Sequence, residues 1–197
     1  ELEAMTADAP DHRLTLQARR HVALYDADAP ANLAALEALR IQFPNDVNLR
    51  LFQLSCLREW DRRDDRLALY REACAAPKAD PILHRQYAEE LLADAREREQ
   101  TERLARLALR ARPNDAAAVS ILARLAWNDG RRDEAVELHR HAACLSDKDE
   151  WLARAYFSAA RMLRHEEEAL RFMRDRVQRH HSKSSQPART LYTALMS

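Results

Sequence analysis

The stretch DAAAVSILARLAWNDGRRDEAVELHRHAACLSDK, residues 115–148, decides the fold of this chain. It contains two runs in which apolar residues return every three or four positions, which is the spacing of one face of an α-helix. Asp115 precedes the first run, where its side chain can accept hydrogen bonds from the free amides of the first turn. Asn128-Asp129-Gly130 separates the runs and is typical of a tight turn. The stretch therefore predicts a helical hairpin.

The same pattern recurs along the chain with a fixed period. Aspartates that can cap a helix stand 34 or 35 residues apart, at Asp11, Asp46, Asp80, Asp115 and Asp149, and Ser184 follows after another 35. About 20 residues after each aspartate, small or apolar residues of a second helix recur with the same period. Two independent columns with one period predict repeats whose hairpins bury their apolar faces against one another.

The period also sets the expected boundaries. We expect a single domain over residues 1–197, with units over 11–45, 46–79, 80–114, 115–148 and 149–183 and a capping helix over 185–196. The first helices are predicted near 11–26, 46–60, 80–95, 115–128 and 149–164. The second helices are predicted near 30–42, 63–76, 98–111, 131–145 and 166–180. Pro44 and Pro113 mark joints between units, because proline cannot continue a helix.

The composition predicts an all-α chain. Alanine, arginine and leucine dominate, and all three favour helices, whereas the β-branched residues that favour strands are few. Gly130 is the only glycine. Phosphate-binding loops and nucleophile elbows need several glycines, so the composition argues against enzymes built on those motifs.

These residues resemble the tetratricopeptide-repeat (TPR) family, whose units are helical hairpins of about 34 residues. The fourth unit is the closest match, with the helix and turn positions of the family at Leu122-Ala123, Gly130, Ala135 and Ala142. Elsewhere the alanine positions of the family are occupied by Arg66, Thr101 and Arg176. The resemblance covers residues 11 to about 181. It implies a right-handed superhelix whose first helices line a groove for partner peptides.

The first helices are predicted to carry an arginine-rich inner side. Counting 2, 5, 9 and 12 residues from each aspartate gives 20 positions, of which seven are arginine and one is acidic. The candidate peptide-binding residues among them are Arg58, Arg85, Glu89, Ser120, Arg124, Trp127, Arg154 and Arg161. Arginine can bind a carboxylate through two hydrogen bonds, and tryptophan can anchor an apolar side chain. The pattern therefore predicts binding of an acidic, partly apolar peptide or helix. The alternative is a solvated or register-shifted face without a binding role.

Other reactive side chains form no recognisable motif. Cys56, Cys74 and Cys144 stand far apart, which predicts reduced, packed thiols rather than a disulfide or zinc site. His139 falls on the packing side of a second helix, and we expect no catalytic residue, metal site or cofactor. The basic stretch over 171–189 is interpreted as part of a solvated last helix, with contact to anions or a membrane surface as the alternative.

We predict a non-catalytic protein–protein interaction scaffold that binds another protein or a segment of the parent chain, with self-association as a further option. The alternative is a substrate-capture or dimerisation region of an enzyme whose catalytic domain lies outside these residues. The 32 basic and 32 acidic residues balance, which argues against nucleic-acid binding, and no apolar run is long enough to enter a membrane. Because the chain begins with Glu1, we expect a module of a larger protein, and the excess of arginine over lysine predicts a bacterial source. The expected location is the cytoplasm.

Overall fold

The computed structural model describes residue 15 and residues 29–196 of the chain. This described part contains ten α-helices, one 3₁₀ turn and no strand, so the predicted all-α fold is confirmed. The chain forms two compact units, Glu1–Leu83 and His84–Ser197. Of the predicted helix over 11–26, only residue 15 is described, and the rest lies outside the described residues.

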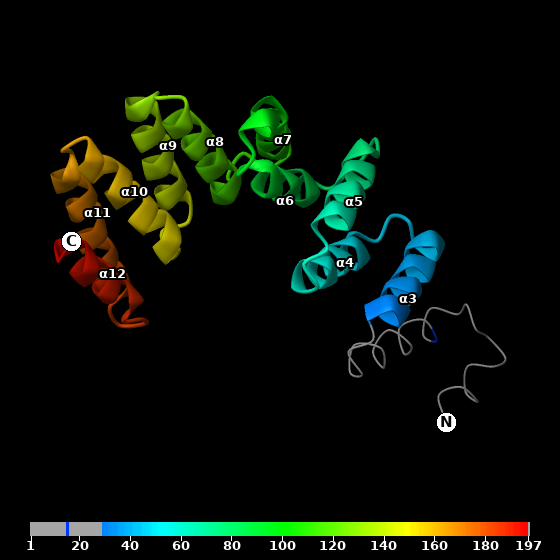
Figure 1. Ribbon diagram of the computed structural model, residues 1–197. Coiled ribbons are helices and arrows are strands. Elements are labelled where there is room, and N and C mark those ends of the chain that lie inside the picture. Colours follow the sequence, from blue (N-terminus) through cyan, green and yellow to red (C-terminus); the bar gives the residue numbers. More distant parts are fainter. Residues whose placement is uncertain (1–14, 16–28, 197) are drawn as a thin grey trace. The chain divides into compact units, whose positions relative to one another are not determined.

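The first unit contains α3 (Ala29–Gln42), α4 (Val47–Glu59) and α5 (Arg63–Ala75), which follow one another in Figure 1. Helix α4 packs on both of the others. Leu39 of α3 and Leu49 of α4 form an apolar cluster on which Phe43 packs. Helix α5 is amphipathic and buries Tyr70 and Ala73 completely.

The second unit is larger. Its helices are α7 (Arg98–Ala111), α8 (Ala116–Asn128), α9 (Arg132–Leu145), α10 (Glu150–Met162), α11 (Glu166–His180) and α12 (Gln186–Leu195). Helix α6 (Pro81–Leu91) spans the boundary between the units, and the 3₁₀ turn η1 (Ala95–Glu97) follows it. Helices α8 and α9 form one hairpin, α10 and α11 form the next, and α12 packs on both members of the second (Figure 1). One core cluster, which includes Val119, Tyr156 and Met173, joins these hairpins.

The observed helix boundaries agree closely with the predicted ones. Helices α7 and α11 begin and end at the predicted residues, 98–111 and 166–180. Helix α6 is the exception, because it ends at Leu91 rather than near residue 95. The side chain of Asp94 accepts a hydrogen bond from the Arg96 amide at 3.0 Å and so caps η1. Aspartate favours caps and turns over helix interiors, which explains the early end of α6.

The predicted aspartate caps are confirmed wherever the structure describes them. Their carboxylate oxygens accept hydrogen bonds from main-chain amides two or three residues later, at 2.9–3.3 Å. The four caps are Asp46, Asp80, Asp115 and Asp149. At the start of α12, Ser184 Oγ accepts from the Gln186 amide at 3.2 Å. Each cap fixes the residue at which its helix begins, and with it the direction of every side chain along that helix.

Three hairpins turn through a residue in the left-handed region. Asp61, Gly130 and Arg164 have φ of 53°, 78° and 60°. In each turn this residue donates its amide hydrogen to the carbonyl three residues earlier, and the next residue donates to the carbonyl five residues earlier. This pair of bonds is the Schellman arrangement that closes a helix. The sequence predicted it only at Gly130, because a glycine marks such a turn and the other two hairpins have none.

The small-residue column of the second helices is buried or half-buried in the second to fifth units, as predicted, but its first two members, Ala31 and Ala34, are exposed. Thr101, Ala135 and Ala169 are fully buried at equivalent positions. Arg176, which stands where the family usually has alanine, is also fully buried. Its guanidinium donates to the Glu150 carboxylate at 2.8 and 3.2 Å and to the Asp147 carbonyl oxygen at 2.5 Å. The interpretation of residues 171–189 as a solvated stretch is therefore wrong at Arg176.

Candidate functional site

Two adjoining pockets lie along α10. The tryptophan pocket has a volume of ≈ 350 Å³ and is lined by Arg124, Trp127, Asn128, His139, Trp151, Ala155, Ser158, Ala159 and Met162. The arginine pocket has a volume of ≈ 420 Å³ and is lined by Arg154, Phe157, Ser158, Arg161, Met162, Met173, Thr190, Thr193 and Ala194. Because they share Ser158 and Met162, they form one continuous surface, which we call the α10 surface.

The sequence of α10 creates the hollow of the tryptophan pocket. Trp151, Ala155, Ser158 and Met162 are spaced i, i+4, i+7 and i+11, so they form one stripe on the helix. The large residues stand at the two ends of this stripe and the small residues in the middle. Trp151 is 55% exposed and Met162 is 72% exposed, which is unusual for large apolar side chains. The stripe therefore leaves a depression with apolar ends.

The neighbouring hairpin supplies the opposite wall. Trp127 of α8 is partly buried against the core and also lines the pocket. The Arg132 guanidinium carbon lies 4.2 Å from the centroid of the Trp127 ring, at cation–π distance. This contact holds the indole and leaves a positive charge beside it.

His139 of α9 also lines the tryptophan pocket. It is 7% exposed, and its Nδ1 has no hydrogen-bond partner within the described chain. Burial lowers the pKa of His139 to about 4, and the nearby Arg124 charge acts in the same direction. The imidazole is therefore neutral at pH 7 and offers one donor and one acceptor nitrogen. The sequence predicted its burial correctly but gave no sign that it borders a pocket.

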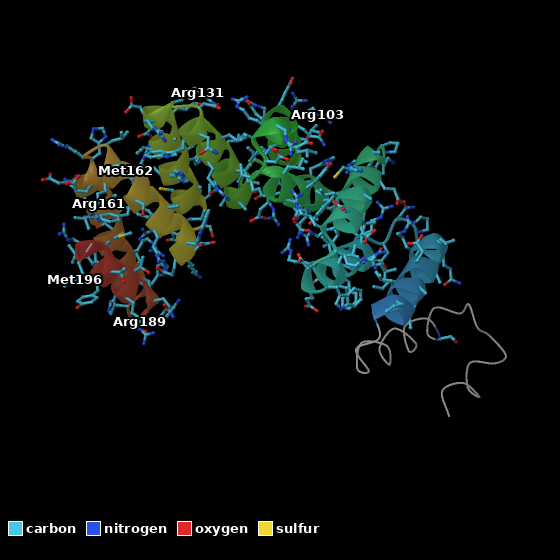
Figure 2. The ribbon with its side chains drawn as sticks, viewed as in Figure 1. Arg103, Arg131, Arg161, Met162, Arg189 and Met196 are labelled. Carbon is cyan, nitrogen blue, oxygen red and sulfur yellow. The ribbon has the colours of Figure 1, made fainter. Side chains whose placement is uncertain are left out.

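Three arginines of the α10 surface carry charge that the chain leaves unpaired. Arg124 lines the tryptophan pocket, and Arg154 and Arg161 line the arginine pocket. All three are exposed, and none forms an ion pair or hydrogen bond with another described residue. Arg161 and Met162 lie side by side at the C-terminal end of α10 (Figure 2). The α10 surface thus combines apolar hollows with unneutralised positive charge.

The structure brings together four of the eight candidate residues, namely Arg124, Trp127, Arg154 and Arg161. Arg85 and Glu89 lie on α6 and pair with each other at 3.5 Å, and Arg85 also pairs with Asp115 at 3.4 Å. The charge of Arg85 is therefore already balanced. Arg58 is exposed on α4 in the first unit.

The placement of Ser120 on an open inner face is wrong. Ser120 is 2% exposed, because α8 packs against both α7 and α9 and has little free surface. Residues on both flanks of Ser120 are buried as well. Only the side of α8 that carries Arg124 remains open.

A third pocket, of ≈ 430 Å³, lies among α3, α4 and α5 in the first unit. Its charged lining residues are paired with one another: Arg40 with Glu37 and Glu72, and Arg62 with Asp65. The pairing with Arg40 lowers the pKa of Glu37 from its ordinary value. This pocket therefore lacks the unneutralised charge that distinguishes the α10 surface.

The remaining reactive groups are dispersed in the described part of the chain. Its three cysteines are free, with Cys56 buried, Cys74 half-buried and Cys144 exposed, so the prediction of packed thiols is wrong for Cys144. No group of three or more metal-ligating side chains occurs among the described residues. None of the described helices is both long enough and apolar enough to span a bilayer.

Comparison with known proteins places the fold. No family model matches the chain, and no curated protein matches it. Solved structures do match. MamA from Desulfovibrio magneticus RS-1 is similar with a TM-score of 0.65 at 13% identity, covering 86% of this chain and 96% of that chain. A thermophilic TPR protein from Thermus thermophilus is similar with a TM-score of 0.64 at 18% identity, covering 92% of this chain and 100% of that chain.

A third structure is YrrB, described as a TPR protein with an unusual peptide-binding site. It has a TM-score of 0.60 at 10% identity and covers 95% of this chain and 96% of that chain. The chain has a TPR fold. At these identities the likeness concerns the fold alone. Within this TPR fold, the walls of the tryptophan pocket come from two successive hairpins, α8–α9 and α10–α11.

Proposed function

We propose that the chain is a non-catalytic protein–protein interaction scaffold whose α10 surface binds an acidic, partly apolar segment. The segment belongs to another protein or to the parent chain. The observation that carries this proposal is the set of three exposed, unpaired arginines around two apolar-lined pockets, Arg124, Arg154 and Arg161.

The physical argument combines charge with apolar area. A single exposed ion pair contributes only about 0–1 kcal/mol, so the arginines alone would bind weakly. Their charges instead favour acidic partners, reject basic ones and accelerate the encounter. Burial of Trp151 and Met162, which the chain leaves exposed, supplies the non-specific part of the affinity. An acidic segment with apolar residues satisfies both requirements.

The charge balance favours a protein partner over a nucleic acid. The chain has as many acidic as basic residues, so it lacks the broad basic field with which proteins follow a phosphate backbone. Three arginines beside apolar pockets suit a peptide with a few carboxylates and apolar residues better than a continuous row of phosphates.

The test is an unbiased selection of short random peptides displayed on phage against the intact chain, followed by affinity measurement. We expect the selected peptides to be acidic and to contain apolar residues. The double variant Arg154→Glu/Arg161→Glu should weaken their binding by at least about tenfold. Arg103→Glu reverses a single charge on α7, away from Arg161 in Figure 2, and should leave binding unchanged.

Three outcomes would overturn the proposal. The first is that no acidic peptides are enriched, and the second is that the enriched peptides bind the double variant as tightly as they bind Arg103→Glu. The third is tighter binding of single-stranded RNA than of any selected peptide, with loss of RNA binding in the double variant.

A further inference from the structure

We propose that the tryptophan pocket holds one aromatic side chain of the bound segment, with an acidic residue close to it in sequence on the arginine pocket. This inference rests on the function proposed above and names the chemistry of the ligand at one position. It is carried by the size of the pocket, the nature of its walls and its continuity with Arg154 and Arg161.

The size of the pocket suits one large side chain. Its ≈ 350 Å³ lies at the lower end of the range of about 300–1,000 Å³ over which proteins bind small molecules. The small residues Ala155, Ser158 and Ala159 form the middle of the hollow, so a planar group can enter without displacing a wall. A methyl or isopropyl group would leave much of this space to water and would bury less of the apolar wall.

The walls favour an aromatic group. Trp127 and Trp151 offer ring faces and edges, and the Met162 thioether makes favourable contacts with aromatic rings. The exposed indole of Trp151 and the exposed Met162 are large apolar groups left uncovered at the two ends of the pocket. Tryptophan, methionine and arginine together are typical of the centre of a protein–protein contact.

The positive charges at the pocket exclude a cationic group, which is the other kind of ligand that two tryptophans can bind. Aromatic walls of this kind can hold a quaternary or methylated ammonium group. Here Arg132 already lies over the Trp127 ring, and Arg124 lines the same pocket. A cationic ligand would meet these two positive charges, whereas a neutral aromatic group meets none of its own sign.

His139 adds a polar group to the pocket. It is more than nine-tenths buried, and its Nδ1 has no partner among the described residues. That nitrogen is itself buried, so His139 forms a neutral wall of the pocket and carries no charge that would repel an aromatic ligand.

The continuity of the two pockets sets the composition of the ligand. They share Ser158 and Met162, so a chain that places its ring between Trp127 and Trp151 passes next to Arg154 and Arg161. The residue beside the ring on that side should be acidic, because each arginine lacks a carboxylate partner within the described chain.

The first experiment uses the peptides selected for binding to the whole chain. We expect an aromatic residue near an acidic one in the enriched sequences. Replacing that aromatic residue by alanine in the tightest synthetic peptide should weaken binding by at least about tenfold, and replacing it by lysine should weaken binding further.

The second experiment fills the pocket with a larger side chain of the protein instead of removing a residue that lines it. Ala155→Phe puts a ring into the pocket and should abolish the advantage of the aromatic peptide over its alanine form. Ala188→Phe adds the same ring at an exposed position on α12 and should preserve that advantage. Far-UV circular dichroism and thermal melting of both variants check that the helices remain folded.

A direct readout uses intrinsic fluorescence. The chain has three tryptophans, and Trp60 is the one outside the pocket, so Trp60→Phe leaves only Trp127 and Trp151 emitting. Binding of a phenylalanine- or tyrosine-containing peptide should shift this emission to shorter wavelength as water leaves the indoles. The alanine form of the peptide should produce a smaller shift at equal occupancy.

The outcomes separate this inference from the proposed function. Acidic peptides that depend on Arg154 and Arg161, but bind equally well with alanine in place of the aromatic residue and to Ala155→Phe, would overturn the anchor site and leave the scaffold function standing. Peptides that are insensitive to the arginine reversals would overturn both.

Discussion

At the scale of single residues, Arg176 stands at a position where the preceding repeats have a small side chain. It is charged, and it is nevertheless buried in the core. The equivalent positions in the two preceding units hold Ala108 and Ala142, which are fully buried like Arg176. A buried guanidinium is tolerated only when it is paired and its hydrogens are bonded. Glu150 and the Asp147 carbonyl meet this requirement. The ion pair ties the start of α10 to α11.

We predict that Arg176→Ala lowers the free energy of unfolding by about 3 kcal/mol, because it removes one partner of a buried pair and leaves space behind. Arg179→Ala breaks the neighbouring pair with Asp147, which is half-exposed, and should cost less than about 1 kcal/mol. Urea denaturation followed by circular dichroism measures both. Equal losses in the two variants would contradict the structural role of Arg176.

His139 gives a second prediction at this scale, concerning pH. Burial lowers its pKa from 6.5 to about 4 in the folded chain, so between these values the unfolded chain binds the proton more readily. Stability contributed by the neutral imidazole is therefore present above pH 6.5 and is lost as the pH falls towards 4. The loss amounts to at most about 3 kcal/mol.

His139→Gln cannot take up this proton, so its stability should fall less than that of the parent chain between pH 6.5 and 4. His181→Gln, at an exposed histidine at the end of α11, serves as the control and should follow the parent chain. Urea denaturation at several pH values measures the difference. Parallel curves for all three proteins would show that His139 titrates in the folded state as it does in the unfolded one.

At the scale of elements, one turn geometry closes three hairpins with three different residues. Asp61, Gly130 and Arg164 occupy the same left-handed position and make the same two main-chain hydrogen bonds. A residue with a Cβ is strained there, whereas glycine is not. The repeat therefore determines the turn conformation. The free-energy cost of adopting that conformation differs between the glycine and the two residues that carry a Cβ.

Two opposite substitutions test this account. Gly130→Ala should destabilise the chain by about 1 kcal/mol through the backbone alone, since no atom lies within 4 Å of the added Cβ. Arg164→Gly should stabilise it by up to about 1 kcal/mol, because it removes the same strain. Thermal melting measures both signs. A destabilising Arg164→Gly would mean that the arginine side chain contributes more than its strained backbone costs.

At the scale of the whole molecule, the sequence predicted the repeat far better than the surface. The period, the caps and most helix ends follow from local rules that act within a few residues, and these predictions were confirmed. The exposure of a side chain on a first helix depends on how that helix is rotated between its two neighbours, which no local rule determines. Ser120 is buried and Arg124 is exposed on the same predicted face for this reason.

The candidate site was predictable in part. The count from the aspartate caps identified Arg124, Trp127, Arg154 and Arg161 on the α10 surface. It missed Met162, although Met162 continues the stripe that begins at Trp151, and it missed His139, which belongs to a second helix. It also included Arg85, whose charge is neutralised by Asp115, the residue that caps α8. An ion-pair partner that is distant in sequence cannot be predicted from the period of the repeat.

The last helix exposes more apolar surface than a cap usually does. Tyr192, Leu195 and Met196 are 66%, 54% and 71% exposed, which is unusual for three large apolar side chains on one side of a helix. We expect this side to promote concentration-dependent self-association. Leu195→Glu/Met196→Glu should lower the mean mass in sedimentation velocity, and Arg189→Glu on the same helix should not. A parent chain that stays monomeric at high concentration would refute this.

The tryptophan pocket has a mechanical consequence because its two walls belong to successive hairpins. In a repeat protein, each hairpin is held to the next only by the interface between the two. A ring bound between Trp127 and Trp151 would contact both hairpins and would raise the free energy needed to separate α10 from the α8–α9 hairpin. Ligand binding should therefore slow amide hydrogen exchange even in helices that the ligand does not contact.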